Sequence, residues 1–395
     1  MRLLYVHGGS RWKFDTEGGL YTDTSSNQDV WDRYLRCGSL TVVLRRDPGV
    51  YPSRTAAARF NAFDRSRADW VSLPDLYRPA SNWFCPRLRW QVEREIARQV
   101  RLADRVIVRG PGNVYADTAL RWARRCRKPC LIEVTGLVWE GAWYHGPAGK
   151  LAAPWRELQC RRSLRQADWA VYVTRRALQK RYPTAGASIG CSDVELTGLD
   201  PRVLSSRLRR TSAQSGPLVI GTAASLDNGG KGQKVVIRAL GLLRRQGWPP
   251  IEYRLAGGGD GRKLLACAER WGVRQQVKLS GCIRHDAMRQ WYDQLDVYIH
   301  PSYGEGLSRA ILEAMARACP VLSTAVGGAG ELTDPGCLFE PGDFRQAARL
   351  LQKMSSPAVR QAQAMACFAR AQDYAKARLD PLREAFYLAF MQEGT

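Results

Sequence analysis

The chain has 395 residues, of which 45% are hydrophobic and 25% charged. This is the composition of a soluble globular protein, and the length exceeds what one compact core needs, so we expect two domains. No stretch approaches eighteen consecutive apolar residues, which excludes a membrane-spanning helix. The 60 basic and 37 acidic residues give a net charge of +23. Such an excess favours binding to an anionic membrane surface, a phosphate-rich ligand or nucleic acid. The alternative is that the basic residues form a solvated surface without a partner.

The first half alternates short apolar runs with helical stretches, which predicts βα repetition and a parallel sheet. The first apolar run is too brief for a signal peptide and is typical of a strand. An amphipathic helix is expected where apolar residues recur every four positions, from Leu88 to Val100. The strands are expected at 3–7, 40–46, 105–110, 130–136 and 169–174.

The second half repeats the rhythm after a stretch at 197–216 that loses periodicity and gains Ser, Arg, Gly and Pro, as a linker does. A last amphipathic helix carries Leu382, Phe386 and Phe390. We therefore predict an α/β protein with two doubly wound, Rossmann-like domains at 1–200 and 201–375, and a C-terminal helix at 376–395 that packs back on the first domain. The strands of the second half are expected at 218–223, 251–257, 277–281, 297–302, 320–324 and 337–340.

The eleven cysteines are scattered without a CxxC pair, and only four histidines accompany them. This pattern argues against a structural zinc site and favours reduced thiols in a cytoplasm. We expect no metal site.

The densest group of polar and glycine residues runs from His300 to Leu332. A strand ends at His300, a glycine-flanked loop carries Glu305, and a helix begins near Ser308 with Glu313 two turns along it. Exposed amides at such a helix start bind anions, and the two carboxylates can hold different hydroxyls of one ligand. Two other glycine-rich turns are expected at the same edge of the sheet. One contains Gly327 and Gly328, and the other brings Lys231 and Lys234. The crevice is therefore expected to hold a phosphate flanked by hydroxyl-rich groups.

The segment EGLSRAILEA at 305–314 resembles the Glu-x7-Glu motif of retaining GT-B glycosyltransferases, specifically glycosyltransferase family 4. The resemblance extends over the second domain through the KGQ loop, LAGGGDGRKL, VKLSGCI, WYDQLDVYIHPS and GGAGEL. The first domain resembles the family more loosely, through VIVRGPGN, EVTGLVWEG and YVTRRALQKRYP. The sequence looks most similar to bacterial capsular and exopolysaccharide glycosyltransferases.

The resemblance implies that the second domain binds a nucleotide-diphosphate sugar and the first domain a saccharide acceptor. Glu313 would hold the ribose, Glu305 would face the transferred sugar, and Lys231 would contact the diphosphate. The family's diphosphate-binding Arg is replaced by Ser225, and Arg309, Lys234 or Arg109 remain alternatives for its charge. The resemblance places further donor contacts at Gly306, Leu307 and Ser308, base contacts at Gly281, Cys282 and Ile283, and a polar role beside the sugar at Glu140 and His145.

The resemblance further implies metal-independent transfer with retention, no cofactor, and an acceptor linked to polyprenyl diphosphate at the cytoplasmic membrane. The basic stretches 121–128 and 156–181, with Trp122, Trp155 and Trp169, are expected on the face that meets an anionic membrane. The localisation expected is cytoplasmic and peripheral at the inner face of the cell membrane. A non-catalytic nucleotide-sugar-binding subunit is the alternative. Nucleic acid is not expected as a partner, because no recognised binding module appears.

Overall fold

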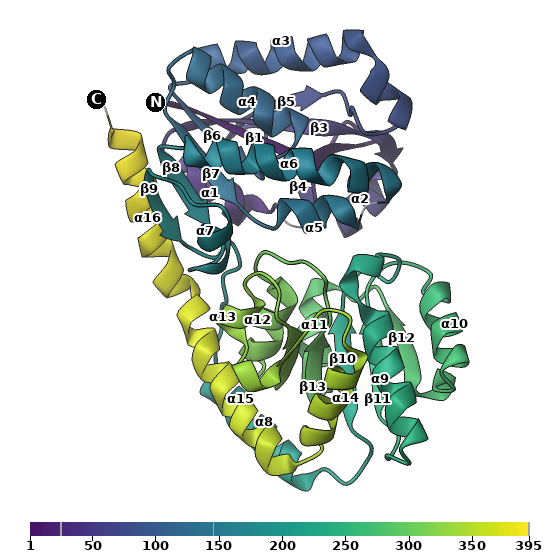
Figure 1. The fold of residues 1–395 in the computed structure, drawn as a ribbon. Helices are drawn as coiled ribbons and strands as arrows, with labels where there is room; N and C mark the ends of the chain where they lie inside the picture. The colour runs from purple at the N-terminus through teal and green to yellow at the C-terminus, as the bar shows by residue number, and fades with distance from the viewer. Residues whose placement is uncertain (24–25, 145, 394–395) are drawn as a thin grey trace.

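A computed structural model describes residues 1–23, 26–144 and 146–393. Two α/β domains stand one above the other, and the C-terminal helix runs from the second domain onto the first (Figure 1). Within the described ranges, no helix is long and apolar enough to cross a membrane.

The first domain is built on a sheet whose core strands are all parallel and lie in the order β5-β3-β1-β6-β7-β8-β9. The chain moves outward from β1 in both directions, so β1 and β6 flank the point where the strand order reverses, which is where doubly wound sheets bind ligands. Two short strands, β2 and β4, extend β1 in antiparallel pairing. The bounds are β1 Arg2–Asp15, β2 Leu20–Thr22, β3 Ser39–Tyr51, β4 Asn61–Ala62, β5 Asp69–Leu73, β6 Arg105–Arg109, β7 Cys130–Val134, β8 Trp169–Tyr172 and β9 Ala187–Gly190.

Strand β1 is much longer than the strand predicted at 3–7. The chain continues extended to Asp15, with a register shift against β3 between His7 and Arg11. The strand continues through Gly8 and Gly9, and its second part is held by Trp12, whose buried ring packs against Phe63 and Trp70.

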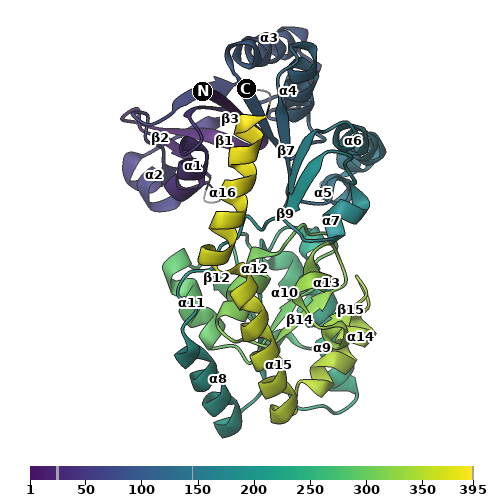
Figure 2. The ribbon, with the colours of Figure 1, turned by 90° about the vertical axis from the view of Figure 1, so that its left-hand side faces the viewer.

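Helices cover both faces of this sheet (Figures 1 and 2). On one face lie α3 (Pro86–Leu102), α4 (Val114–Arg125), the short α5 (Val138–Trp143) and α6 (Pro147–Arg165). The opposite face is covered by α1 (Gln28–Leu35) and by the C-terminal helix α16 (Lys376–Gln392), whose side chains Tyr34 and Tyr387 contact each other. Two short helices, α2 and α7, span Ser53–Arg59 and Ala177–Arg181.

The second domain has a six-stranded parallel sheet in the order β12-β11-β10-β13-β14-β15, which reverses between β10 and β13. Helices α9, α10 and α14 pack together on one side, and α8, α11, α12 and α15 on the other. The strands are Val219–Ala223, Glu252–Ala256, Val277–Gly281, Val297–His300, Val321–Thr324 and Leu338–Phe339; the helices are α8 Pro201–Ala213, α9 Gln233–Arg245, α10 Arg262–Arg270, α11 His285–Asp293, α12 Arg309–Ala316, α13 Ala329–Leu332, α14 Phe344–Lys353 and α15 Pro357–Ala371.

The stretch predicted as a linker at 197–216 is largely helix α8. Asp200 caps its first turn by accepting a hydrogen bond from the amide of Arg202. The buried guanidinium of Arg207 donates to the carbonyl oxygens of Tyr292 and Leu295, which fixes the helix on the second domain. The prediction was wrong because the buried positions of this helix, Arg207 and Thr211, are polar and create no apolar period.

The C-terminal helix crosses back to the first domain, as predicted. Tyr387 donates to the buried carboxylate of Glu133, and Phe390 packs against Trp169. Phe390 is fully buried, but Leu382 is 46% exposed. The apolar residues that the spacing placed on one face of the helix are therefore not all on the face that packs against the protein. Arg383 replaces Leu382 in that face, where it bonds Glu195.

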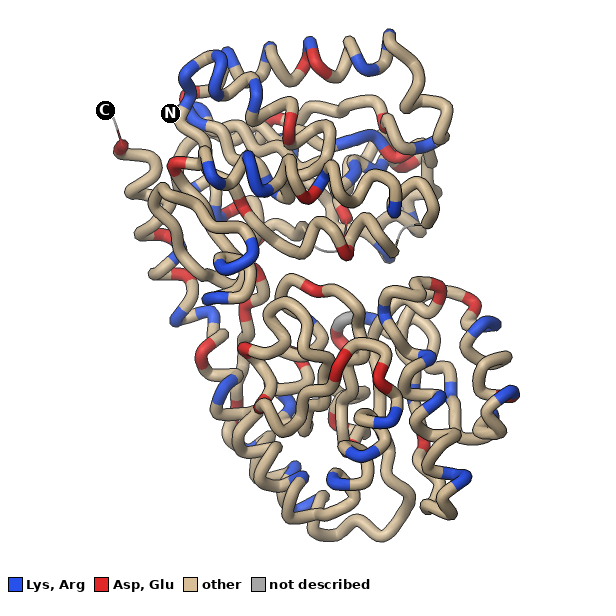
Figure 3. Tube along the Cα trace, viewed as in Figure 1, with Lys and Arg blue, Asp and Glu red and all other residues tan. Residues whose placement is uncertain are grey.

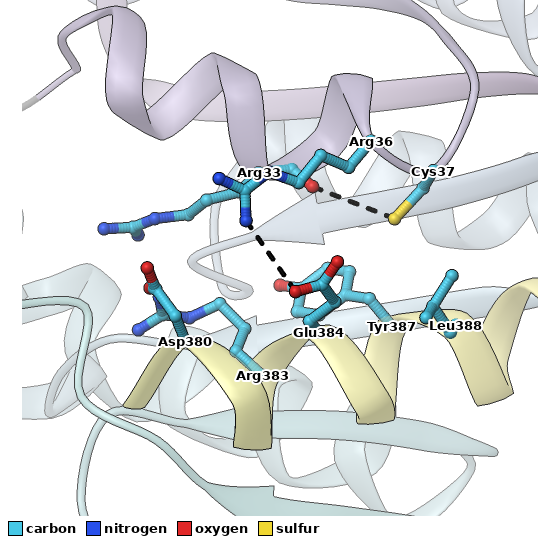
Figure 4. Close-up of a pocket in the computed structure, with 8 residues that line it drawn as sticks. All are labelled: Arg33, Arg36, Cys37, Asp380, Arg383, Glu384, Tyr387 and Leu388. Carbon is cyan, nitrogen blue, oxygen red and sulfur yellow. Dashed lines mark hydrogen bonds and ion pairs between the residues drawn. The ribbon is translucent and has the colours of Figure 1, made fainter. Parts of the chain in front are cut away.

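Figure 4 shows a small pocket where α16 meets α1. Arg36, which follows the last residue of α1, pairs with Glu384 on α16 at 3.8 Å, and Tyr387 and Leu388 complete the wall. Deeper in this junction, Glu195 pairs with Arg33 at 2.7 Å and with Lys376 at 2.9 Å. The junction therefore joins α1, the crossing between the domains and α16 through charges.

Candidate active site

The centre of the site is a contact between two loops of the second domain. Strand β13 ends at His300, the following loop carries Glu305, and Ser308 caps α12 by accepting a hydrogen bond from the amide of Ile311. Lys231 lies in the 3-10 turn Gly229–Lys231 after β10, and its Nζ is 2.5 Å from Oε1 of Glu305. Because β10 and β13 are neighbours at the reversal of strand order, both side chains meet at the carboxyl edge of the sheet.

Glu305 is held in its charged form. Burial alone opposes ionisation, but the hydrogen bond with His300 Nε2 at 3.1 Å and the charge of Lys231 outweigh it and lower the pKa of Glu305 to about 2. The other ring nitrogen of His300 lies 3.2 Å from the hydroxyl of Tyr298. His300, the last residue of β13, is thus buried and directly supports Glu305.

Glu313 lines an open pocket of about 310 Å³. One of its carboxylate oxygens accepts a hydrogen bond from Tyr292 at 3.1 Å, which orients the carboxylate on the partly buried side of α12. The exposed Arg309 stands one turn before it. The pocket is lined by Ala223, Ala224, Ser225, Ala256, Gly257, Cys282, Ile283, Met288, Tyr292, Arg309, Ala310 and Glu313.

A second pocket of about 410 Å³ continues from the first. It shares Met288, Tyr292, Arg309 and Glu313 with it and reaches the chain that crosses between the domains, at 194–198. The donor pocket predicted in the second domain therefore opens toward the junction of the two domains.

Five of the predicted donor residues meet at the first pocket. Ser225, Cys282, Ile283, Arg309 and Glu313 line the first pocket, and Gly281 precedes it with φ of +69°, a conformation that favours glycine. By contrast, Lys234 is exposed on the first turn of α9 and lines neither pocket.

Gly306 and Leu307 are buried where the two domains touch. A side chain at Gly306 would collide with the carbonyl of Thr135, in the turn after β7. Only glycine therefore lets the loop of Glu305 approach the first domain this closely. Thr135 and Gly136 are functional-site neighbours that sequence reasoning did not single out.

Two predicted residues of the first domain have different outcomes. Glu140 lies over Gly304 and pairs with Arg181 at 3.6 Å, while its second carboxylate oxygen is buried without a hydrogen-bond partner among the residues described. His145 lies outside the described residues.

Arg109 is one of the three cations considered for the missing diphosphate-binding Arg. Its guanidinium is paired with Glu133 at 2.7 Å and with Asp193 at 2.5 Å, so its charge is already engaged. Arg309 lines both pockets and has no such ion pair among the described residues. Tyr292, which orients Glu313, was missed because a tyrosine in an apolar helical pattern gives no signal of a polar role.

No group of three or more metal-ligating His, Cys, Asp or Glu side chains gathers anywhere in ranges 1–23, 26–144 and 146–393. The polar groups that the site does offer are carboxylates, Lys231, Arg309 and the amides at the start of α12. These groups match hydroxyls and phosphate oxygens.

Comparison with known proteins agrees with this geometry. A family model described as "Glycosyl transferases group 1" matches residues 217–356. Protein CapJ of Staphylococcus aureus is 26% identical over 356 residues, covering 89% of this chain and 86% of CapJ. The amylovoran biosynthesis glycosyltransferase AmsK of Erwinia amylovora is 31% identical over 182 residues, which cover 42% of this chain and 44% of AmsK.

Solved structures share the whole architecture. Sucrose-phosphate synthase of Thermosynechococcus elongatus superposes with a TM-score of 0.68 at 16% identity, and HepE of Anabaena, in complex with UDP, with 0.63 at 18%. Each comparison covers 98% of both chains. The predicted GT-B fold, two Rossmann-like domains with a C-terminal helix that crosses back, is confirmed.

Proposed function

The chain carries a glycosyl transferases group 1 domain at residues 217–356, and from this premise we propose that it transfers a sugar from a nucleotide-diphosphate sugar to a saccharide acceptor in bacterial polysaccharide biosynthesis. The observation that carries the proposal is the contact of Lys231 with Glu305 at the reversal of strand order in the second sheet, together with Glu313, which lies on the helix that follows and lines the first pocket. CapJ and AmsK support the biological setting, and the UDP complex of HepE supports a nucleotide donor.

Each residue has a distinct part in the proposed reaction. Glu313 accepts hydrogen bonds from the ribose hydroxyls, and Glu305 faces the sugar. The bond between the anomeric carbon and the diphosphate oxygen breaks as the acceptor oxygen bonds to that carbon. Lys231 and the amides at the start of α12 stabilise the charge that develops on the departing diphosphate, and the acceptor proton passes to that diphosphate.

The transfer is proposed to retain the anomeric configuration. Glu305 is fixed by two hydrogen-bonding partners, Lys231 and His300, so it is suited to holding the sugar rather than to attacking its anomeric carbon. Acceptor attack on the face that the diphosphate leaves then needs no protein nucleophile. Proton NMR of the first-formed product tests this, and an inverted product would exclude retention.

A thermal-shift panel of nucleoside diphosphates and nucleotide sugars tests the function directly. A ligand that binds only the folded protein raises the midpoint of unfolding, and we expect one nucleotide class to do so. The shift should be lost in Glu313→Ala but kept in Glu305→Gln and in Glu269→Ala, a control on exposed α10. Glu305→Gln should bind donor and lose turnover. A parent that binds nucleotide sugars and transfers no sugar would be the non-catalytic subunit instead, and a parent that binds none would refute the proposal.

We also propose a lipid-linked acceptor, held at an anionic membrane by the first domain. The outward face of α6 carries Leu151, Trp155 and Leu158, spaced by four and three residues and 85%, 65% and 43% exposed. Basic residues follow on the same helix at Arg162 and Arg165, and further Lys and Arg occur on the neighbouring helices (Figure 3). An apolar stripe beside basic residues is the arrangement of interfacial helices.

Two of the tryptophans expected on this face do not fit there. Trp169 is buried against Phe386 and Phe390 of α16, so its predicted place at the membrane was wrong. Trp122 is only partly exposed, and Arg101 and Arg125 lie over its ring. The apolar contribution to membrane contact is therefore assigned to α6.

Co-sedimentation with phosphatidylglycerol-containing vesicles tests the membrane proposal. The parent should bind at low salt and dissociate at 1 M salt, where the Debye length falls to about 3 Å. A Leu151→Ser, Trp155→Ser double variant should bind more weakly, whereas Trp248→Ser in the second domain should not. Binding that ignores lipid charge and salt, or no binding, would refute membrane contact and leave the transferase proposal intact.

A further inference from the structure

His7 occupies the reversal of strand order in the first sheet. It pairs with Leu44 of β3 on one side and with Arg109 of β6 on the other, at the last position before β1 shifts register. The equivalent position of the second sheet holds the loops of Lys231 and Glu305. A doubly wound sheet binds its ligands at the reversal of strand order. The proposed donor contacts use the reversal in the second sheet and leave the reversal in the first sheet without an assigned ligand.

The imidazole of His7 is uncharged. Burial first, and then the nearby positive charges of Arg109 and Arg45, lower its pKa to about 3. The ring packs edge-on against Tyr5 at 6.3 Å. Neither ring nitrogen has a hydrogen-bond partner in the part of the chain that the structure describes, although a neutral imidazole offers one donor and one acceptor.

Gly110 lies close to both His7 and Thr135. A side-chain carbon at Gly110 would lie 4.0 Å from Nε2 of His7 and 4.0 Å from Oγ1 of Thr135. Both polar atoms, one from β1 and one from the turn after β7, therefore lie near the same glycine. Thr135 is also the residue whose carbonyl contacts Gly306, next to Glu305.

We propose that Nε2 of His7 and Oγ1 of Thr135 bind hydroxyl groups of the acceptor saccharide, on the first-domain side of the contact with the loop of Glu305. The inference rests on the proposed function and extends it to a binding site in the first domain. A sugar hydroxyl both donates and accepts hydrogen bonds, as do a neutral imidazole and a threonine hydroxyl. The donor is already provided for by Glu313, Arg309 and Ser225 in the other domain, which leaves this pair for the acceptor.

Kinetics with defined acceptors test the site. The probes are octyl glycosides of glucose, galactose and N-acetylglucosamine, used with the nucleotide sugar that stabilises the parent most. We expect His7→Ala to raise the acceptor KM at least tenfold and Thr135→Val three- to tenfold, while the donor KM stays within twofold. His7→Gln should recover part of the loss. Tyr5→Phe, which alters the ring packed on His7 without removing it, should leave the acceptor KM unchanged.

A second measurement needs no turnover. In protein labelled with ¹⁵N-histidine and loaded with nucleoside diphosphate, the glycosides should shift the ring resonances of His7, which His7→Gln identifies. Equal increases in the KM of donor and acceptor would assign the pair to the donor sugar and overturn the proposal. An unchanged acceptor KM, or His7 signals that no glycoside shifts, would overturn it too. A parent that binds no nucleotide would instead refute the proposed function.

Discussion

Replacing Glu313 by alanine removes the contact on which donor binding most depends in the proposed function. The carboxylate has two oxygens, and one of them already accepts a hydrogen bond from Tyr292 at 3.1 Å. A ribose offers two vicinal hydroxyls, and hydrogen bonds to a charged group contribute about 1.5–3 kcal/mol each. Taking the lower value for both bonds gives a loss of about 3 kcal/mol, or roughly 150-fold weaker binding.

Isothermal titration with the nucleoside diphosphate that stabilises the parent measures this loss. Tyr292→Phe is the matched variant, because it removes only the hydroxyl that orients Glu313 and keeps the aromatic wall of the pocket. One neutral donor contributes about 1 kcal/mol, so binding should weaken by roughly fivefold. If Glu313→Ala binds within threefold of the parent, the ribose does not contact Glu313 and the assignment of the pocket is refuted.

Three other predictions follow from the charges and contacts described. The pKa of Glu195 is lowered to about 2, because the charges of Arg33 and Arg383 outweigh the effect of burial. A carboxyl group whose pKa is lowered by folding stabilises the fold above its unfolded pKa of about 4.5, here on the order of 3 kcal/mol. This stabilisation is lost as the pH falls toward 2. Urea midpoints should therefore fall from pH 5 to 3 in the parent and less steeply in Glu195→Gln, and equal slopes would contradict this. Transfer should persist after EDTA treatment, since Lys231 and backbone amides are proposed to stabilise the diphosphate; activity that returns only with added magnesium or manganese would count against it. Arg207→Leu should lower the urea midpoint, because the carbonyls of Tyr292 and Leu295 lose their buried donor, and an unchanged midpoint would show that α8 does not depend on this contact.

The strands were predictable because parallel strands covered on both faces are continuous apolar runs, as at Val106–Val108 and Val297–Ile299. Helix α8 was not, since it is fixed by the polar contacts of Arg207, which no apolar period records. The second part of β1 was hidden behind two glycines that are typical of turns. Local pattern therefore identified the elements that bury apolar side chains and missed those held by other contacts.

The candidate site divides in the same way. Glu305, Glu313 and Lys231 were predicted from motifs that follow strands, and the structure brings Glu305 and Lys231 into contact. Tyr292 precedes Glu313 by 21 residues and Thr135 lies in the first domain, and only folding places them beside these residues. The position of Trp169 was misjudged for the same reason, because the helix that covers it lies more than two hundred residues further along the chain.

That long-range cover affects how the protein is made. The face of the first sheet that holds Glu133 and Trp169 is closed by Tyr387 and Phe390, which follow the entire second domain in the sequence. Domains generally begin to fold from the N-terminus during synthesis. Here the first domain must wait with this face uncovered until α16 has been synthesised, so the period of greatest exposure to aggregation or proteolysis lasts for the synthesis of the entire second domain.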